Sequence, residues 1–236
     1  MKLIIAGATG LVAQEVIRQS LRNPTIKSIV ALARKPVALP AGADASKLKS
    51  VVVKDYDDYS DEVKQEFAGA DACIWTVAIT PTKSKEMPFD EVKRVCYTST
   101  LVGLSALHDA GLARPFRFIY MSGIAAERNQ SKTPAVMPEY SLMRGETENR
   151  VLAFAAAHSA EQFEACVVKP GYITHDAASL ARAEQLKSSV GIPSITVEVS
   201  AAAMLYQVAR GFEKEPLENA DLVRIGRGAL LLEVDA

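Results

Sequence analysis

The sequence predicts a doubly wound parallel α/β sheet, and three observations carry that prediction. A short apolar strand leads directly into a glycine-containing turn and a helical pattern, within MKLIIAGATGLVAQEVI at the start of the chain. Strand-like and helix-like segments then alternate, which favours parallel βαβ units with right-handed crossovers. No internal repeat, low-complexity segment or Ser/Gly linker divides the sequence, so residues 1–236 are expected to form one domain.

The first element is a strand at residues 3–6, followed by helical spacing of apolar residues through Leu21. The turn between them has the pattern G-x-x-G-x-x-A, formed by Gly7, Gly10 and Ala13, in place of a strict G-x-G-x-x-G. Glycines bring backbone N–H groups close to a ligand, and a helix N-terminus favours negative charge. The turn therefore suits a dinucleotide pyrophosphate. The alternative is an ordinary βα turn with a small residue at the packing face.

The remaining elements follow in order along the chain. Strands are expected at residues 28–33, 49–54, 72–77, 116–122 and 164–170, and helices at 61–67, 89–110 and 139–159. Further on, VEVSAAAMLYQVARGF is interpreted as a strand end followed by a helix. The long loops 80–88 and 125–138 follow strand ends, where open α/β sheets bind ligands. Together with residues 172–200, these loops are the expected walls of a substrate pocket.

Composition excludes several classes of protein. With 49% hydrophobic and 23% charged residues, a chain of 236 residues can bury one substantial core. A formal net charge of −1 offers no basic field to nucleic acid or to a membrane surface, and no apolar run spans a bilayer. The apolar stretch before Gly7 is too short for a signal peptide. Cys73, Cys96 and Cys166 stand among apolar neighbours, which favours reduced thiols and a cytoplasmic protein.

No metal site is expected. His108, His158 and His175 do not form a ligand-spaced cluster, and the first two are interpreted as helix-surface or packing residues. The acidic run at residues 55–61 lacks the glycine and the terminal glutamate of an EF-hand loop, so it is interpreted as a solvated turn. Trp75 lies in an expected buried strand and is interpreted as a core residue.

Six motifs, in order along the chain, resemble those of the atypical short-chain dehydrogenase/reductase family, close to its NmrA-like NADP-binding members. They are GATGLVA, ALARKP, VVVKDYDD, FIYMSG, YSLMRGETE and KPGYIT. The resemblance covers nearly the whole chain and implies a Rossmann fold, a nicotinamide cofactor and redox chemistry. It also implies that ADLVRIGRGALLL supplies the closing strand and tail, and that the short C-terminal part leaves a small substrate pocket.

The resemblance places one set of residues at the cofactor. They are Gly7, Thr9, Gly10, Leu11, Arg34, Lys35, Asp55, Val77, Pro170 and Thr174. Arg34 and Lys35 stand where NAD-specific relatives carry an acid, and a guanidinium can bind a 2′-phosphate through two N–H groups, which favours NADP (NADPH). Asp55 resembles the acid that contacts the adenine amino group, and Thr174 would hold the carboxamide. The alternatives are a solvated basic loop for Arg34 and a plain turn residue for Asp55.

Ser122, Tyr140 and Arg144 are the candidate catalytic residues. Tyr140 and Arg144 are four positions apart on an expected helix and share a face, where a cation makes tyrosine a better proton-transfer group. Ser122 resembles the family's serine that bonds the substrate carbonyl, with a capping role as the alternative. The family uses Y-x-x-x-K. Arg144 keeps the positive charge of that lysine but cannot act in a proton relay.

The expected function is NADP-dependent reduction of a small carbonyl or related organic substrate, with the proton supplied by Tyr140. Ser122 and Tyr140 favour an enzyme, whereas Arg144 favours the alternative, a non-catalytic NADP-binding redox sensor or scaffold that acts through a protein partner. A sugar epimerase or dehydratase is a third interpretation, disfavoured by the short C-terminal part. Neither nucleic acid nor a membrane is an expected partner.

Overall fold

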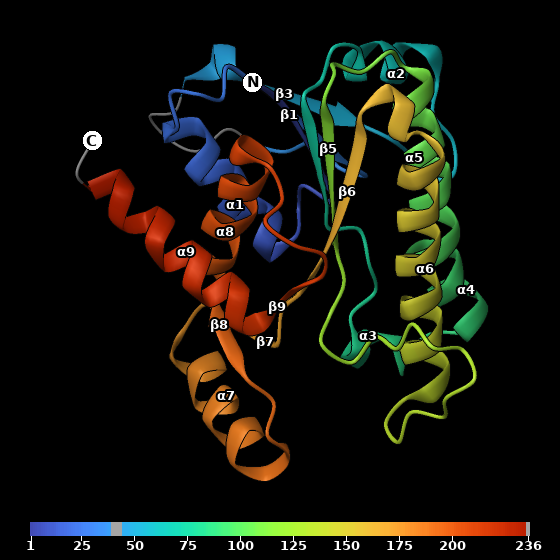
Figure 1. The fold of residues 1–236 in the computed structure, drawn as a ribbon, viewed down its shortest axis with the longest axis vertical. Helices are drawn as coiled ribbons and strands as arrows, with labels where there is room; N and C mark the ends of the chain where they lie inside the picture. The colour runs from blue at the N-terminus through green and yellow to red at the C-terminus, as the bar shows by residue number, and fades with distance from the viewer. Residues whose placement is uncertain (39–43, 235–236) are drawn as a thin grey trace.

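The computed structural model describes residues 1–38 and 44–234 and confirms the predicted doubly wound α/β fold. Seven parallel strands form one sheet in the order β3-β2-β1-β4-β5-β6-β9 (Figure 1). Their bounds are β1 Lys2–Ala6, β2 Ser28–Ala33, β3 Leu48–Val52, β4 Ala72–Trp75, β5 Phe116–Met121, β6 Phe163–Lys169 and β9 Leu217–Glu218. The strand order reverses between β1 and β4, and such a reversal opens a ligand-binding crevice at the carboxyl ends of the strands.

Helices cover both faces of the sheet, so the strands are nearly continuous apolar runs. On one face lie α1 Leu11–Arg22, α8 Val197–Arg210 and α9 Asn219–Val234, and on the other α2 Asp61–Phe67, α5 Ser99–Asp109 and α6 Pro138–Ala157 (Figure 1). Strand β1 shows how the sequence builds both cores. Leu3 and Ile5 enter the core beneath α1 and α8, while Ile4 and Ala6 enter the core beneath α5 and α6.

Trp75 is a core residue, as predicted. Its side chain is 1% exposed, and its indole N–H donates to Thr100 Oγ1 at 3.1 Å. Gly103 gives the ring its place under α5, because a Cβ there would lie 2.2 Å from the indole. Cys73, Cys96 and Cys166 are buried free thiols. Within the described ranges, no helix is long and apolar enough to cross a membrane.

The single helix expected at residues 89–110 is divided into three consecutive helical segments. They are α4 Phe89–Lys93, a π-helical turn at Arg94–Thr98, and α5. The wider turn gives Arg94 a position from which its guanidinium reaches two carboxylates after β3. Before α4, the loop expected at 80–88 contains the short helix α3 Pro81–Ser84, whose first turn is capped by the Thr80 hydroxyl.

The C-terminal part corrects two predictions. ADLVRIGRGALLL is not a closing strand but lies in α9, and the two-residue β9 closes the sheet before it. The physical reason is that Leu222 and Ile225, nearly one helical turn apart, are both buried in the core shared with α8. VEV is likewise the first turn of α8 and not a strand end.

A second, two-stranded parallel sheet lies between β6 and α8. It pairs β7 Tyr172–Thr174 with β8 Ser194–Thr196, and α7 Ala177–Val190 connects the two strands. In Figure 1 this unit extends beyond the carboxyl end of β6. The segment predicted to line a substrate pocket, 172–200, therefore lies at the edge of the sheet where ligands of this fold bind.

Candidate active site

The turn after β1 is built to approach a ligand closely. Gly7 has φ +81°, a conformation that L side chains rarely adopt, and a Cβ there would lie 2.6 Å from Thr76 Oγ1. The N–H groups of Gly7 and Ala8 both donate to the Leu32 carbonyl at 3.0 Å, which holds the turn against β2. No side-chain hydrogen bond caps α1 at Gly10, so the first-turn N–H groups point outward uncapped.

The turn after β1 faces solvent on one side and β4 on the other. Thr9 and Gly10 are exposed, and Leu11 is 47% exposed although it is apolar, which suits a lining residue of an open crevice. Val77 follows β4 and is 6% exposed. Its backbone nitrogen lies 3.2 Å from the Cβ position of Gly7. The reversal of strand order therefore brings Gly7 and Val77 together.

Arg34 and Lys35 form an exposed cationic pair directly after β2. Among the residues that the structure describes, neither side chain makes a hydrogen bond or an ion pair. After the hydrogen bond from Arg94, the charge of Arg34 also lowers the pKa of Glu91, although Arg34 and Glu91 form no ion pair in the described structure. Both cations at the carboxyl end of β2 are exposed and available to an anionic ligand.

Asp55 is bound from within the chain. Both of its carboxylate oxygens accept from Arg94 Nη1, at 2.8 and 2.9 Å, and Asp57 Oδ2 accepts from the same nitrogen at 2.7 Å. Burial raises the pKa of Asp55, but the hydrogen bond and charge of Arg94 and the backbone hydrogen bonds from Asp57 and Tyr56 together outweigh it, and the pKa lies below its usual range. The Asp55 side chain is 47% exposed. This ionised carboxylate can accept a further N–H donor.

Tyr140 and Arg144 lie on α6, as predicted, and both are engaged with backbone carbonyls. The Tyr140 hydroxyl donates to the Ile79 carbonyl at 2.8 Å, and Arg144 Nη2 donates to the Met121 carbonyl at 2.7 Å. Arg144 is 4% exposed, its guanidinium carbon lies 4.9 Å from the Tyr120 ring centroid, and its Nη1 is buried without an acceptor in the described chain. Burial raises the pKa of Tyr140 more than the Arg144 charge lowers it, so the phenol is protonated at neutral pH.

Glu148 is a site residue that sequence reasoning missed. It is fully buried and accepts from Ser122 Oγ at 2.5 Å and from Arg128 Nε at 2.6 Å, with Lys169 Nζ at 3.5 Å. The Ser122 proton is therefore committed to a carboxylate, and the hydroxyl offers other groups only its lone pairs. A sequence signal existed, because Tyr140, Arg144 and Glu148 recur at intervals of four within YSLMRGETE.

The loop expected at 125–138 is held against α6. Glu127 N–H donates to the Ser141 carbonyl at 3.0 Å, and a Cβ on Gly145 would lie 1.8 Å from the Glu127 carbonyl oxygen. At the end of the loop, Met137 has φ +47° and precedes the first residue of α6. A non-glycine residue in the left-handed region is held there by its surroundings. The loop therefore has a defined position beside Tyr140.

The turn after β6 is anchored by the C-terminal elements. Pro170 is buried, and Gly171 N–H donates to Asn219 Oδ1 at 2.9 Å. A Cβ on Gly171 would lie 2.1 Å from the Pro193 carbonyl oxygen, so this position requires glycine. Thr174 is 5% exposed, and its hydroxyl lies 3.5 Å from the Ile195 carbonyl. Helix α9, which the sequence did not predict, thus positions the KPGYIT motif.

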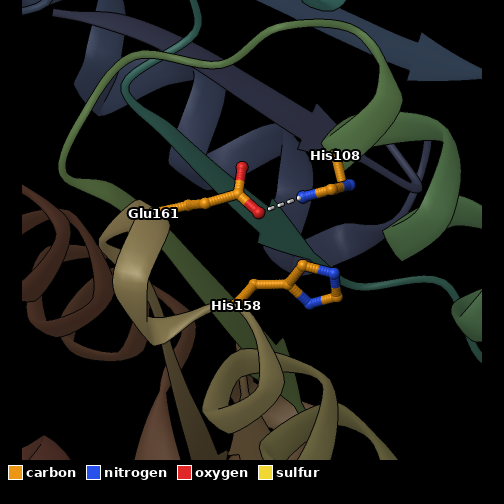
Figure 2. A group of neighbouring side chains, drawn as sticks. All are labelled: His108, His158 and Glu161. Carbon is orange, nitrogen blue, oxygen red and sulfur yellow. Dashed lines mark hydrogen bonds and ion pairs between the residues drawn. The ribbon is translucent and has the colours of Figure 1, made fainter.

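The expectation that the histidines form no ligand cluster is wrong for two of them. His108 and His158 meet Glu161, with one ligand atom of each within 4.8 Å of the others (Figure 2). These residues lie near the amino ends of β5 and β6, at the opposite edge of the sheet from the glycine turn. His175 is exposed and lies beside Asp176 at the start of α7.

This chain is similar to known proteins in sequence and in fold. A family profile described as NAD(P)H-binding matches residues 7–210. Leucinostatins biosynthesis cluster protein T of Purpureocillium lilacinum is 32% identical over 125 residues, which are 52% of this chain and 42% of that protein. Protein FMP52, mitochondrial, of Candida albicans is 25% identical over 182 residues, which are 72% of this chain and 66% of that protein. The chain thus matches less than two thirds of the length of either relative.

Among solved structures, a short-chain dehydrogenase/reductase family oxidoreductase from Burkholderia thailandensis is similar in fold. It superposes with a TM-score of 0.65 at 18% sequence identity, and the match covers 99% of this chain and 97% of that one. At this identity the likeness establishes the fold alone.

Proposed function

This chain belongs to the NAD(P)H-binding family of Rossmann proteins, and from that premise we propose that it is an NADP-dependent oxidoreductase that reduces a small carbonyl or related organic substrate. One observation carries the proposal. A half-buried, protonated Tyr140 lies beside Arg144, whose Nη1 has no acceptor in the described chain. Its expected location is the cytoplasm, where unpaired thiols stay reduced.

The residues present fit NADPH. The uncapped N-terminus of α1 and the turn at Gly7, Thr9 and Gly10 would bind the pyrophosphate. Arg34 and Lys35 would bind the 2′-phosphate, Asp55 the adenine amino group, and Thr174, beside Pro170, the carboxamide. Arg144 Nη1 is a buried donor that a ribose hydroxyl would satisfy. Bound NADPH would supply the hydride.

Tyr140 is the proton donor in this proposal. Its raised pKa keeps the proton on the phenol at neutral pH, and the neighbouring Arg144 cation stabilises the phenolate that forms when the proton leaves. To reach a substrate oxygen the phenol must leave the Ile79 carbonyl. Ser122 would donate to the substrate carbonyl after its hydroxyl leaves Glu148, because a carbonyl oxygen can only accept. Residues 80–88, 125–138 and 172–200 would form the pocket walls.

A second candidate function is favoured by a specific observation. The two groups expected to act on the substrate carbonyl both donate inside the chain, Tyr140 to the Ile79 carbonyl and Ser122 to Glu148. A site whose hydroxyl protons are both occupied suits a protein that binds NADP without turnover and signals its redox state to a protein partner. Catalysis and binding therefore have to be measured separately.

Replacing Tyr140 by Phe tests the enzyme. Turnover of small aldehydes and ketones with NADPH should fall about 10²-fold or more, while the NADPH dissociation constant stays the same, because only the proton donor is lost. Tyr206→Phe is the matched control, since Tyr206 is 37% exposed on α8 and should leave both quantities unchanged. Equal turnover in wild type and Tyr140→Phe contradicts the assignment. NADPH binding without turnover of any substrate favours the sensor.

Replacing Arg34 by Ala tests the cofactor, whichever function holds. A charge-assisted hydrogen bond contributes roughly 1.5–3 kcal/mol, so NADPH affinity should fall about tenfold to a hundredfold and NADH affinity much less. Calorimetric titration of both cofactors into wild type, Arg34→Ala and a control, Arg182→Ala on exposed α7, gives the comparison. Equal losses for NADPH and NADH, or a wild-type preference for NADH, refute the NADP assignment.

A further inference from the structure

A cluster of metal-ligating side chains lies at the amino edge of the sheet, outside the proposed redox site. His108 is in the last turn of α5, His158 follows the last residue of α6, and Glu161 ends the 3₁₀ turn η3 (Ser159–Glu161) that leads into β6. All three side chains are half-buried, and one ligand atom of each lies within 4.8 Å of the other two. Figure 2 shows the Glu161 carboxylate facing His108, with the His158 ring packed beside the His108 ring at 4.1 Å between centroids. No step of the proposed reaction uses these residues.

A hydrogen bond to a backbone carbonyl sets the protonation of the His158 ring for ligation. His158 Nδ1 lies 2.8 Å from the Phe154 carbonyl oxygen. A carbonyl can only accept, so Nδ1 carries the proton and Nε2 of the neutral ring keeps its lone pair. Metal-ligating histidines have this arrangement, with the second ring nitrogen donating to a backbone carbonyl or carboxylate. His108 is different, because its Nε2 lies 3.2 Å from Glu161 Oε1, which can only accept, so this nitrogen carries a proton that a metal ion would displace.

The spacing of the ligand atoms fits a small tetrahedral ion. Two ligands at about 2.0–2.1 Å from zinc in tetrahedral geometry are about 3.4 Å apart. His108 Nε2 and Glu161 Oε1 are already 3.2 Å apart. The largest separation in the cluster, at most 4.8 Å, would have to close by about 1.4 Å to reach that value. The Glu161 side chain is 44% exposed, so a side-chain rotation can supply this movement.

We propose that His108, His158 and Glu161 bind one divalent transition-metal ion, with zinc as the ion that two imidazole nitrogens and one carboxylate oxygen suit. A hollow lined in part by His108, Arg114 and Glu161 opens beside the cluster and leaves room for a water in the fourth position. Two of the ligands, His108 and Glu161, are 53 positions apart in the sequence. The ion would therefore link α5 to the junction of α6 and β6, which is a structural role.

One neighbouring charge limits the affinity. Arg114 Nη2 lies 3.3 Å from Glu161 Oε2, and a cation so close to the site repels a metal ion. The same contact holds the second carboxylate oxygen away from the rings, which leaves Oε1 as the oxygen that faces His108. Asp109, on the other side, adds negative charge next to His108.

Zinc binding by the untagged full chain tests the proposal. Equilibrium dialysis against zinc chloride with elemental analysis should find one zinc per chain. Cobalt(II) in place of zinc should give the visible bands of a tetrahedral nitrogen and oxygen site without a thiolate charge-transfer band. His158→Gln and Glu161→Gln should each raise the zinc dissociation constant about tenfold or more. His175→Gln is the control, because it removes the third histidine of the chain and should leave zinc binding unchanged.

Three results would overturn the proposal. They are no zinc bound by wild type in excess zinc, equal binding by wild type and Glu161→Gln, and a cobalt thiolate band, which would assign the ion to a cysteine. Circular dichroism checks that each variant is folded. If His158→Gln fails to fold, Glu161→Gln decides the matter alone, because it keeps the size of a half-exposed side chain.

Discussion

At the scale of single residues, a buried carboxylate decides what the predicted catalytic serine can do. Glu148 is fully buried, and two cations compensate its charge, Arg128 at 2.6 Å and Lys169 at 3.5 Å. A carboxylate is a stronger acceptor than a carbonyl, so the Ser122 hydroxyl keeps its hydrogen bond to Glu148. The donor role expected for Ser122 therefore requires that Glu148 gives up this hydrogen bond.

Glu148→Gln should lower the free energy of unfolding by about 3–5 kcal/mol, because it leaves the Lys169 and Arg128 cations without their buried counter-charge. Glu146→Gln is the matched control, two residues earlier on α6. Its carboxylate pairs at 2.7 Å with Arg150, which is 58% exposed, so its loss should change stability by about 0.5 kcal/mol or less. Urea unfolding of both variants measures the difference. Equal effects would show that the Glu148 network contributes no more than a surface pair.

At the scale of elements, close packing of helices explains where two of the glycines stand. Helix α9 crosses α8 where Gly226 meets Val199, and a Cβ on Gly226 would lie 2.0 Å from the Val199 carbonyl oxygen. Gly228, on the same helix, has no atom within 4 Å of its Cβ position. Gly226 and Gly228 thus share one helix but differ in their neighbours. Substituting each in turn distinguishes the effect of helix packing on stability from the effect of helix propensity.

Gly226→Ala should destabilise the protein by about 1–3 kcal/mol, because the added methyl group pushes α9 away from α8. Gly228→Ala should instead stabilise it by about 0.5–1 kcal/mol, because alanine favours the helix and meets no atom. Thermal or urea unfolding of both variants measures whether each substitution lowers or raises the free energy of unfolding. A stabilising Gly226→Ala would mean that α8 and α9 are not in close contact.

At the scale of the whole molecule, the parallel sheet separates the two sites. Every strand of the sheet ends at the same edge, so Gly7 after β1, Arg34 after β2 and Ser122 after β5 meet there although they are far apart in sequence. The helices return to the opposite edge, where the C-terminal ends of α5 and α6 bring His108 and His158 together (Figure 1). The proposed redox site and the proposed metal site thus lie at opposite ends of the strands.

The sequence by itself determined the elements whose signals are local. The bounds of β2 and α2 agree with those expected, because the signals for both lie within a few residues. Strand β2 is a short apolar run between polar residues, and α2 begins after a serine cap with an acidic first turn. The glycine turn and the cations after β2 were identified in the same way, since each motif is contiguous. Strand alternation was enough to predict the fold class.

Tertiary structure decided what depends on contacts between distant segments. Helix α9 was mistaken for a strand because an apolar segment reveals its period only against the surface that buries it, here α8. The partners of Ser122 lie 26 positions away, and His108 meets Glu161 across 53 positions. Spacing along the chain carries no information about such pairs, because the distance between them is set by how the helices pack on the sheet.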